Sequence, residues 1–425
     1  MTRKNQEIFP SLVNFLLRSK FINYQAKMKF TILKKDKKSR IGRIETKHGS
    51  FETPAFIPVA TAATIRALDN RDILDLGSSV VLANTYHLHL RPGDSIIKEL
   101  GGLHKFMNWD GPIVTDSGGF QAFSLGFAVE HGVGKIADNY LDFSNKKKHE
   151  KVFSEKKFAK VTEKGVVFKD PINGEKRFLT PKKSMDIQSN LGSDIIFAFD
   201  ECTSPLSSKR YTTEALLRTH NWALECLKYY DKKQALFGIV QGGAYKDLRV
   251  KSAKFIGGLN FDGFGVGGSL GKSKEDMHKI LDWVVPLLPA DKPRHLLGIG
   301  AVEDLFNSVE RGIDMFDCVA PTRWARRGHV YISPTGGGNA KNKFRFNIEN
   351  KKFENDKKPI DKTCSCYACK NHSRAYLRHL FKSSELTYFR LASIHNLNFI
   401  LRLMEKIRES IKDGSFKKLK KEWLF

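Results

Sequence analysis

Two aspartates are the side chains of this 425-residue chain best suited to chemistry. Asp116 lies in the run TDSGGFQ (115–121), and Asp317 lies in MFDCVAPTR (315–323). Each follows a short apolar run and precedes turn-forming or basic residues, as a carboxylate at the end of a buried strand does. Two carboxylates at strand ends suit chemistry at a sugar carbon or at a base.

A lone aspartate after a strand is also a common N-cap of the following helix. The neighbours of both aspartates weigh against that interpretation. Ser117 and the two glycines after it leave room for a ligand to approach the backbone near Asp116. Arg323, Arg326 and Arg327 follow Asp317, and arginines beside a carboxylate suit the phosphates that flank a reacting nucleoside.

The elements that must position these residues form a regular alternation of apolar, strand-like runs and amphipathic stretches. Eight such units predict a (β/α)8 barrel, although a doubly wound sheet has a similar rhythm. In such barrels the active site lies at the carboxyl ends of the strands, where the motif residues fall. We expect the strands at 54–59, 80–84, 113–115, 195–199, 235–240, 261–266, 295–299 and 313–319, and helices at 213–229, 274–285 and 301–311.

The organisation predicted from this rhythm is a catalytic barrel at 28–345 and a smaller C-terminal unit at 346–425. An insertion at about 127–180 interrupts the barrel, and Pro171 to Gly174 mark a hairpin inside it. This insertion either covers a nucleic acid or is a decoration. Residues 1–27 are expected to be a poorly docked extension, an organellar presequence or the product of an upstream start codon.

The composition favours a polyanionic partner. The formal net charge is +26, more than a soluble fold needs, and nucleic acid accounts for it better than a general lysine bias does. No apolar run approaches the length of a membrane span. The six cysteines do not form a disulfide framework, which indicates a reducing compartment and, for the whole chain, a cytoplasmic location.

Three of the cysteines predict a metal site. Cys364, Cys366 and Cys369 offer three thiolates within one turn, and one histidine would complete a closed Cys3His zinc site. A closed site has no open coordination position, so one structural zinc ion per chain is expected. The histidines that follow, His372, His379 and His395, are the candidates for the fourth ligand.

Six motifs together resemble the queuine-type tRNA-guanine transglycosylases. They are the segments around Asp116 and Asp317, FDEC (199–202), VQGG (240–243), GG (267–268) and the cysteine cluster. The resemblance runs from about residue 28 to the C-terminus and implies the same barrel. It also implies that Asp317 is the nucleophile at C1′ of a ribose, that Asp116 is the general base, and that His395 is the fourth zinc ligand.

The resemblance also implies a pocket for guanine. Asp200 accepts hydrogen bonds from the base, Gln241 and the backbone N–H of Gly268 donate to O6, and Phe120 and Leu297 enclose the ring. By composition alone Phe120 and Leu297 would be core residues, and Gln241 a hydrogen-bonding residue of the barrel interior. The other residues assigned to the pocket are Ser117, Ser269 and Gly271.

One position departs from the bacterial pattern. Gly271 stands where bacterial members carry a valine and eukaryotic catalytic subunits a glycine, so the incoming base is either 7-aminomethyl-7-deazaguanine or the larger queuine. The family implies a tRNA whose anticodon begins G-U, contacted by Arg323, Arg326 and Arg327, and a homodimer. A non-catalytic tRNA-binding subunit is the alternative, but the three aspartates argue against it. The closed cysteine site argues against a zinc hydrolase.

Overall fold

The computed structural model describes residues 27–122, 159–171, 173–268, 270–271 and 273–425. The predicted extension at 1–27 lies outside the described residues except for Lys27. Residues 127–158 of the predicted insertion and Ser269 of the predicted base pocket lie outside them as well.

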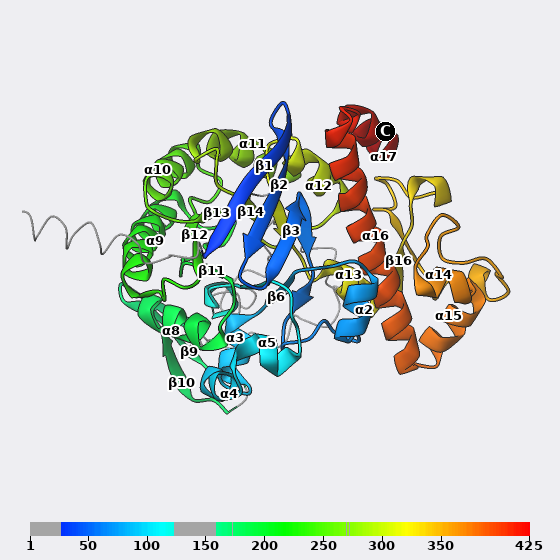
Figure 1. The fold of residues 1–425 in the computed structure, drawn as a ribbon, viewed down its shortest axis with the longest axis horizontal. Coiled ribbons are helices and arrows are strands. Elements are labelled where there is room, and N and C mark those ends of the chain that lie inside the picture. Colours follow the sequence, from blue (N-terminus) through cyan, green and yellow to red (C-terminus); the bar gives the residue numbers. More distant parts are fainter. Residues whose placement is uncertain (1–26, 123–158, 172, 269, 272) are drawn as a thin grey trace, which may run out of the picture.

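The central sheet is a closed parallel barrel (Figure 1). Nine hydrogen-bonded segments form it, but β4 and β5 are two halves of one strand interrupted at Pro58. β4 pairs with β15 and β5 pairs with β6, so the first strand closes the ring. The (β/α)8 prediction is therefore confirmed, and the doubly wound alternative is excluded because the sheet has no edge. The strands are β4 (Ala55–Ile57), β5 (Val59–Ala60), β6 (Val81–Ala83), β7 (Ile113–Thr115), β11 (Ile195–Phe197), β12 (Ala235–Val240), β13 (Gly263–Val266), β14 (Arg294–Leu296) and β15 (Met315–Asp317).

Helices surround the barrel between successive strands (Figure 1). The three helices expected from the amphipathic pattern are present, and α9 starts four residues before its predicted start at 213. Ser208 and Ser273 cap α9 and α11 with their side chains. The helices are α2 (Asn70–Asp75), α3 (Thr85–Leu90), α4 (Asp94–Glu99), α5 (Gly102–Met107), α8 (Pro181–Leu191), α9 (Lys209–Tyr229), α10 (Lys246–Gly257), α11 (Lys274–Val284), α12 (Val302–Val309) and α13 (Ala320–Ala325).

Strand periodicity decides which side chains face the barrel axis. Along β15, Met315 belongs to the cluster inside the barrel and Phe316 to the cluster between strands and helices. Side chains alternate along a strand, so Asp317 returns to the inside. The same alternation places Asp116 after inward-facing Val114. The strand ends therefore point both aspartates toward one space.

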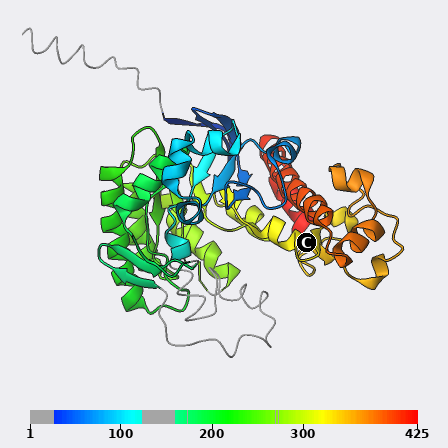
Figure 2. The same ribbon diagram turned by 90° about the horizontal axis from the view of Figure 1, so that it is seen from below.

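A three-stranded antiparallel sheet covers the amino-terminal end of the barrel (Figures 1 and 2). It consists of β1 (Met28–Asp36), β2 (Ser39–Thr46) and β3 (Gly49–Thr53). Arg40 anchors the sheet, because its buried guanidinium contacts Asp314, just before β15, at 2.6 Å. With this end closed, the opposite, carboxyl end of the barrel carries the open cavity. This sheet was not among the predicted elements.

The described part of the insertion forms a second small sheet of β8 (Ala159–Thr162), β9 (Gly165–Lys169) and β10 (Lys176–Leu179). β9 and β10 pair antiparallel, with Lys169 opposite Lys176. The hairpin predicted at 171–174 is therefore confirmed.

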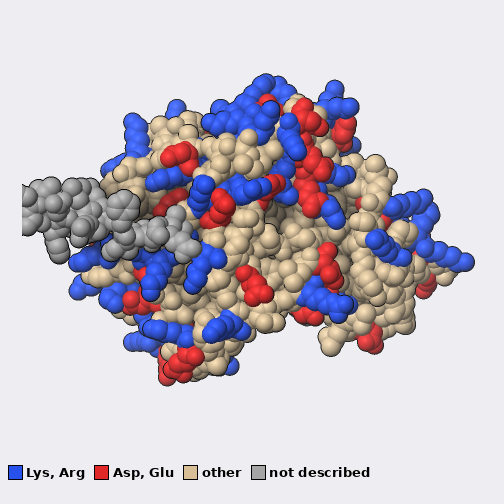
Figure 3. Space-filling view, in the orientation of Figure 1, with Lys and Arg blue, Asp and Glu red and all other residues tan. Residues whose placement is uncertain are grey.

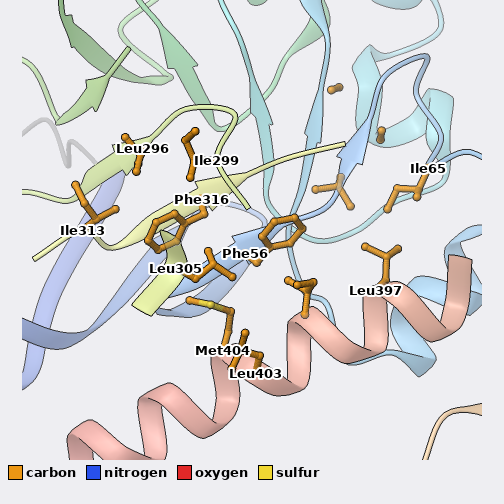
Figure 4. Close-up of a cluster of buried hydrophobic side chains, with 14 of the residues drawn as sticks. Phe56, Ile65, Leu296, Ile299, Leu305, Ile313, Phe316, Leu397, Leu403 and Met404 are labelled. Carbon is orange, nitrogen blue, oxygen red and sulfur yellow. The ribbon is translucent and has the colours of Figure 1, made fainter. Parts of the chain in front are cut away.

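The C-terminal part of the chain first extends away from the barrel and then packs against it through a long helix. A hairpin of β16 (His329–Tyr331) and β17 (Arg345–Asn347) leads to α14 (Tyr367–Asn371) and α15 (Arg374–Lys382). The long helix α16 (Leu386–Lys412) then packs against β4, and α17 (Phe416–Leu424) follows. In Figure 4, Leu397, Leu403 and Met404 of α16 lie against a cluster that includes Phe56 and Phe316. No helix in the described part of the chain combines the length and the apolarity that crossing a membrane requires.

Candidate active site and metal centre

A cavity of about 940 Å³ opens at the carboxyl ends of the barrel strands. It brings together side chains that lie as far apart in the sequence as Val59 and Arg345. Asp116, Asp200 and Asp317 all line it. The other predicted residues in its wall are Ser117, Phe120, Gly268, Leu297, Arg323, Arg326 and Arg327.

Asp116 is held by four hydrogen-bond donors. The backbone N–H groups of Thr85 and Gly118 donate to Oδ1 at 2.9 and 3.2 Å. The side-chain amides of Asn84 and Gln121 donate to Oδ2 at 2.5 and 3.1 Å. The carboxylate is thus fixed in position by the chain segment after β6 and by its own loop.

The pKa of Asp116 is raised to about 6. Burial of the carboxylate is the largest cause, and the negative charge of Asp317 acts in the same direction. The hydrogen bonds from Thr85, Gln121 and Gly118 oppose this shift. A carboxylate that exchanges its proton near neutral pH is suited to general acid–base work.

Asp317 lies at the end of β15 with 15% of its side chain exposed. Nε2 of His295 and the backbone N–H of Gly298 both lie 2.9 Å from its Oδ1. A carboxylate only accepts hydrogen bonds, so Nε2 of the fully buried His295 carries the proton. These donors hold one oxygen of the carboxylate in a fixed position, as a nucleophilic carboxylate requires.

Asp200 and Gln241 form a polar pair beside the two aspartates. The amide Nε2 of Gln241 donates to Oδ2 of Asp200 at 2.5 Å, and the Ser117 hydroxyl donates to Oδ1 at 3.3 Å. The other amide atom of Gln241, Oε1, is buried without a hydrogen-bond partner among the described residues. A Cβ added at Gly268 would lie 1.9 Å from that oxygen, so only glycine leaves room for this arrangement. The pair presents acceptors and donors of the kind that the edge of a purine base requires.

Three predicted pocket residues are not in this wall: Gln241, which donates to Asp200 of the wall, Ser269 and Gly271. Ser269 lies outside the described residues. Gly271 does not line the cavity, and a Cβ added there would lie 2.3 Å from Cβ of Asp276 on α11. Together with its φ of +92°, this contact accounts for the glycine by local packing. The structure therefore does not support the interpretation that Gly271 enlarges a base pocket.

Further side chains, which the motifs did not identify, complete the site. Asn84 and His295 hold the two aspartates, but neither stands in a motif segment, so only their proximity in space identifies them. Arg66 reaches the cavity from the loop after β5, and Lys343 and Arg345 reach it from the β16–β17 hairpin. These three add to the basic wall formed by Arg323, Arg326 and Arg327.

The arginines of this wall crowd one another. The pKa of Arg326 is lowered first by burial and then by the charges of Arg66, Arg323 and Arg327. Guanidinium groups held so close together favour a polyanion that neutralises them. On the face that carries β1–β3, the basic side chains do not form a separate patch. Figure 3 shows lysines and arginines there interspersed with acidic side chains. The net charge alone thus does not locate a nucleic-acid site, and the crowded arginines beside Asp317 are the candidate for one.

A second constellation lies in the C-terminal part. The thiols of Cys364, Cys366 and Cys369 surround His395 of α16, with Sγ to Nδ1 distances of 3.6, 3.6 and 3.3 Å. All four ligand atoms lie within 4.8 Å of one another. This cluster could therefore hold a metal ion, and of the three candidate histidines it is His395 that the fold brings to the cysteines.

The geometry of the cluster fits zinc. Tetrahedral bonds of about 2.3 Å to sulfur and about 2.0 Å to nitrogen place these ligand atoms about 3.5 Å apart. Nε2 of His395 lies 2.8 Å from the Tyr331 carbonyl oxygen, to which it donates, so Nδ1 is the nitrogen left for the metal. The Asn398 amide also donates to Cys364 Sγ at 3.2 Å. Four protein ligands leave no open coordination position.

Comparison with known proteins identifies the family of this chain. The family model for queuine tRNA-ribosyltransferase matches residues 35–150 and 145–425. A curated protein of Archaeoglobus fulgidus is 66% identical over 399 residues, which cover 93% of this chain and 99% of that protein. Queuine tRNA-ribosyltransferases of Fusobacterium nucleatum and Bacillus subtilis are 46% and 45% identical, over 92% and 91% of this chain and 95% and 92% of theirs. The chain belongs to the queuine tRNA-ribosyltransferase family.

Proposed function

We propose that this protein is a tRNA-guanine transglycosylase, which exchanges a guanine of tRNA for a free 7-deazaguanine base. One observation carries the proposal: Asp116 and Asp317 face one cavity whose wall also holds Asp200 and a crowded set of arginines. A carboxylate nucleophile, a carboxylate base and a base-recognition group are the parts that this exchange requires.

The exchange proceeds by two displacements. An oxygen of Asp317 attacks C1′ of the ribose, and the C1′–N9 bond breaks with its electron pair going to N9, which takes a proton from protonated Asp116. Guanine leaves and a covalent RNA–aspartate ester remains. The incoming base then gives its N9 proton to Asp116 and attacks C1′ with the freed electron pair, which releases Asp317 as a carboxylate. Two inversions retain the configuration at C1′.

Base recognition falls to Asp200, Gln241 and Gly268. In the structure the Gln241 amide donates to Asp200. A bound guanine would replace that amide as the donor to the Asp200 carboxylate, through its N1–H and its amino group. The amide of Gln241 and the backbone N–H of Gly268 would then donate to O6, while Phe120 and Leu297 enclose the ring. Ser117, which donates to Asp200, keeps that carboxylate in place.

The RNA contacts are proposed for the basic wall at the cavity mouth. Arg323, Arg326 and Arg327 would hold the phosphates on either side of the reacting nucleotide. The target is the first anticodon base of tRNAs whose anticodon begins G-U. The homodimer and the cytoplasmic location expected from the family stay predictions, and so does the choice between 7-aminomethyl-7-deazaguanine and queuine.

The metal proposed for the cysteine cluster is one structural zinc ion, held by Cys364, Cys366, Cys369 and His395. When bound, zinc would supply a rigid link between the chain at 364–369 and helix α16. It would take no part in the chemistry, because the cluster is closed and its residues are not part of the cavity wall.

The test is a base-exchange assay with tRNA that carries labelled guanine at the first anticodon position. Adding 7-aminomethyl-7-deazaguanine or queuine is expected to release the label, and the base that releases it faster is the physiological one. Release with neither base, although the tRNA stays bound, would contradict the proposal and favour the non-catalytic binding subunit.

The role of Asp116 predicts a pH dependence. A general base must be deprotonated, so the rate with the incoming base should fall about tenfold per pH unit below the Asp116 pKa of about 6 and be level above it. Asp116→Asn should slow exchange by roughly 10²-fold or more and remove this acid limb. The measurement is kcat/KM for the free base from pH 4.5 to 8. An acid limb that persists unchanged in Asp116→Asn would show that another group titrates.

A further inference from the structure

Arg249 is a buried cation that the chemistry proposed above does not use. It lies in the first turn of α10, is fully buried and donates to three backbone carbonyls. Its Nε donates to Gly243 O at 2.7 Å, and its Nη1 donates to Val240 O at 2.9 Å and to Gly267 O at 3.1 Å.

Burying a guanidinium costs free energy because the charge is removed from water, so its hydrogen bonds must offset that cost. Burial lowers the pKa of Arg249 to about 10, so the side chain still carries its charge at neutral pH. The planar guanidinium offers several donors in a fixed fork, which a lysine ammonium does not. This side chain is therefore suited to holding several carbonyls at fixed spacing.

The three carbonyls belong to the segments that carry the base-recognition groups. Gln241 lies between Val240 and Gly243, at the end of β12. Gly268 directly follows Gly267, at the end of β13. One side chain thus ties together the two neighbouring strand ends that carry the groups proposed to recognise the base.

Helix α10 also holds Gln241 directly. The Gln241 backbone N–H donates to the hydroxyl of Ser252 at 3.1 Å, and Ser252 is fully buried one turn after Arg249. At Gly242 an added Cβ would lie 2.8 Å from the Arg249 backbone nitrogen, and φ is +135°. The turn after Gln241 therefore rests on the start of α10.

We propose that Arg249 is a positioning residue that sets the affinity for the free base. It does so by fixing the distance between the Gln241 amide and the Gly268 N–H, the two groups that address the same oxygen of the base. The inference rests on the proposed function and adds to it a residue that does not touch the substrate. A small displacement of either donor would weaken binding of the base, whereas the proposed phosphate contacts, which dominate tRNA affinity, come from other loops.

The test compares Arg249→Lys with the wild type. Lysine keeps the charge but cannot bridge the three carbonyls, so KM for 7-aminomethyl-7-deazaguanine should rise roughly tenfold or more. The Kd for tRNA should stay within about twofold, and kcat at saturating base should change less than KM does. Ser252→Ala should shift KM in the same direction by a smaller factor, and it serves as the test if Arg249→Lys does not fold.

Arg294→Lys is the matched control. Arg294 is also buried and also donates to backbone carbonyls, those of Leu288, Pro289 and Gly312, but at the start of β14, on the amino-terminal side of the barrel. The Arg294→Lys variant should lower the melting temperature as Arg249→Lys does, yet leave KM for the free base unchanged.

The outcomes separate this inference from the proposed function. A wild-type protein that exchanges no base overturns the proposed function. An active wild type with equal KM values for Arg249→Lys and Arg294→Lys overturns the positioning role. A rise in the tRNA Kd equal to the rise in KM for the base would also overturn it, because it would indicate general damage to the barrel end.

Discussion

Replacing Asp317 by asparagine is expected to abolish base exchange while leaving tRNA affinity within about twofold of the wild type. Asparagine has the same shape but cannot form the ester with C1′, so turnover should fall by roughly 10⁴-fold or more. The measurements are label release from tRNA, and capture of a covalent protein–RNA species on a denaturing gel. The wild type should form that species and the variant should not.

Asp282→Asn is the control for this experiment. Asp282 lies on the outside of α11, where its half-exposed carboxylate pairs with Arg311. It should leave both turnover and capture unchanged. Covalent capture of RNA by Asp317→Asn would contradict the assignment and direct attention to Asp116, the other reactive carboxylate of the cavity.

Loss of the metal is expected to unfold the C-terminal part. The protein should contain one zinc ion per chain, and Cys369→Ala should abolish its retention and lower the melting temperature by roughly 10 °C or more. Structural zinc sites contribute their binding free energy to folding, and removing one ligand exposes the others to proton competition. Elemental analysis and thermal unfolding, each with and without a chelator, provide the measurement.

Cys226→Ala is the matched control, because Cys226 is a buried thiol outside the cluster. It removes a sulfur from the core and should cost only the few degrees expected of a small cavity. A folded, active protein without bound metal would contradict the proposed zinc site.

Much of the site followed from local sequence patterns. Asp317 ends one three-residue strand and Asp116 directly follows another, and the alternation of side chains makes both face inward. Such a pattern is local, so the sequence alone predicts it. The cysteine cluster was predictable for the same reason, since three of its four ligands lie within six residues. The choice of His395 came from the family resemblance, because the sequence places two other histidines nearer to the cysteines.

The remaining features depend on contacts between distant segments. His295 reaches Asp317 from the neighbouring strand, and its own sequence surroundings are those of an ordinary core residue. Arg40 pairs with Asp314 across 274 residues, so the sheet that covers the barrel end has no local signal of its role. Gly271 has a local explanation that the sequence does not show: its positive φ and its contact with Asp276 account for a glycine there, and its effect on the incoming base stays a prediction.

Helix α16 links the metal centre to the barrel. It carries His395. The neighbouring Asn396 donates to the carbonyl of Pro321, four residues after Asp317, at 2.9 Å and to the carbonyl of His329, at the start of β16, at 3.0 Å. The same helix covers Phe56 and Phe316 at the seam where the first and last strands meet (Figure 4). The chain from 346 onward is thus not a detachable module: a protein truncated at residue 345 would leave that apolar seam open to water and to aggregation. A designed protein that uses this barrel must therefore include α16.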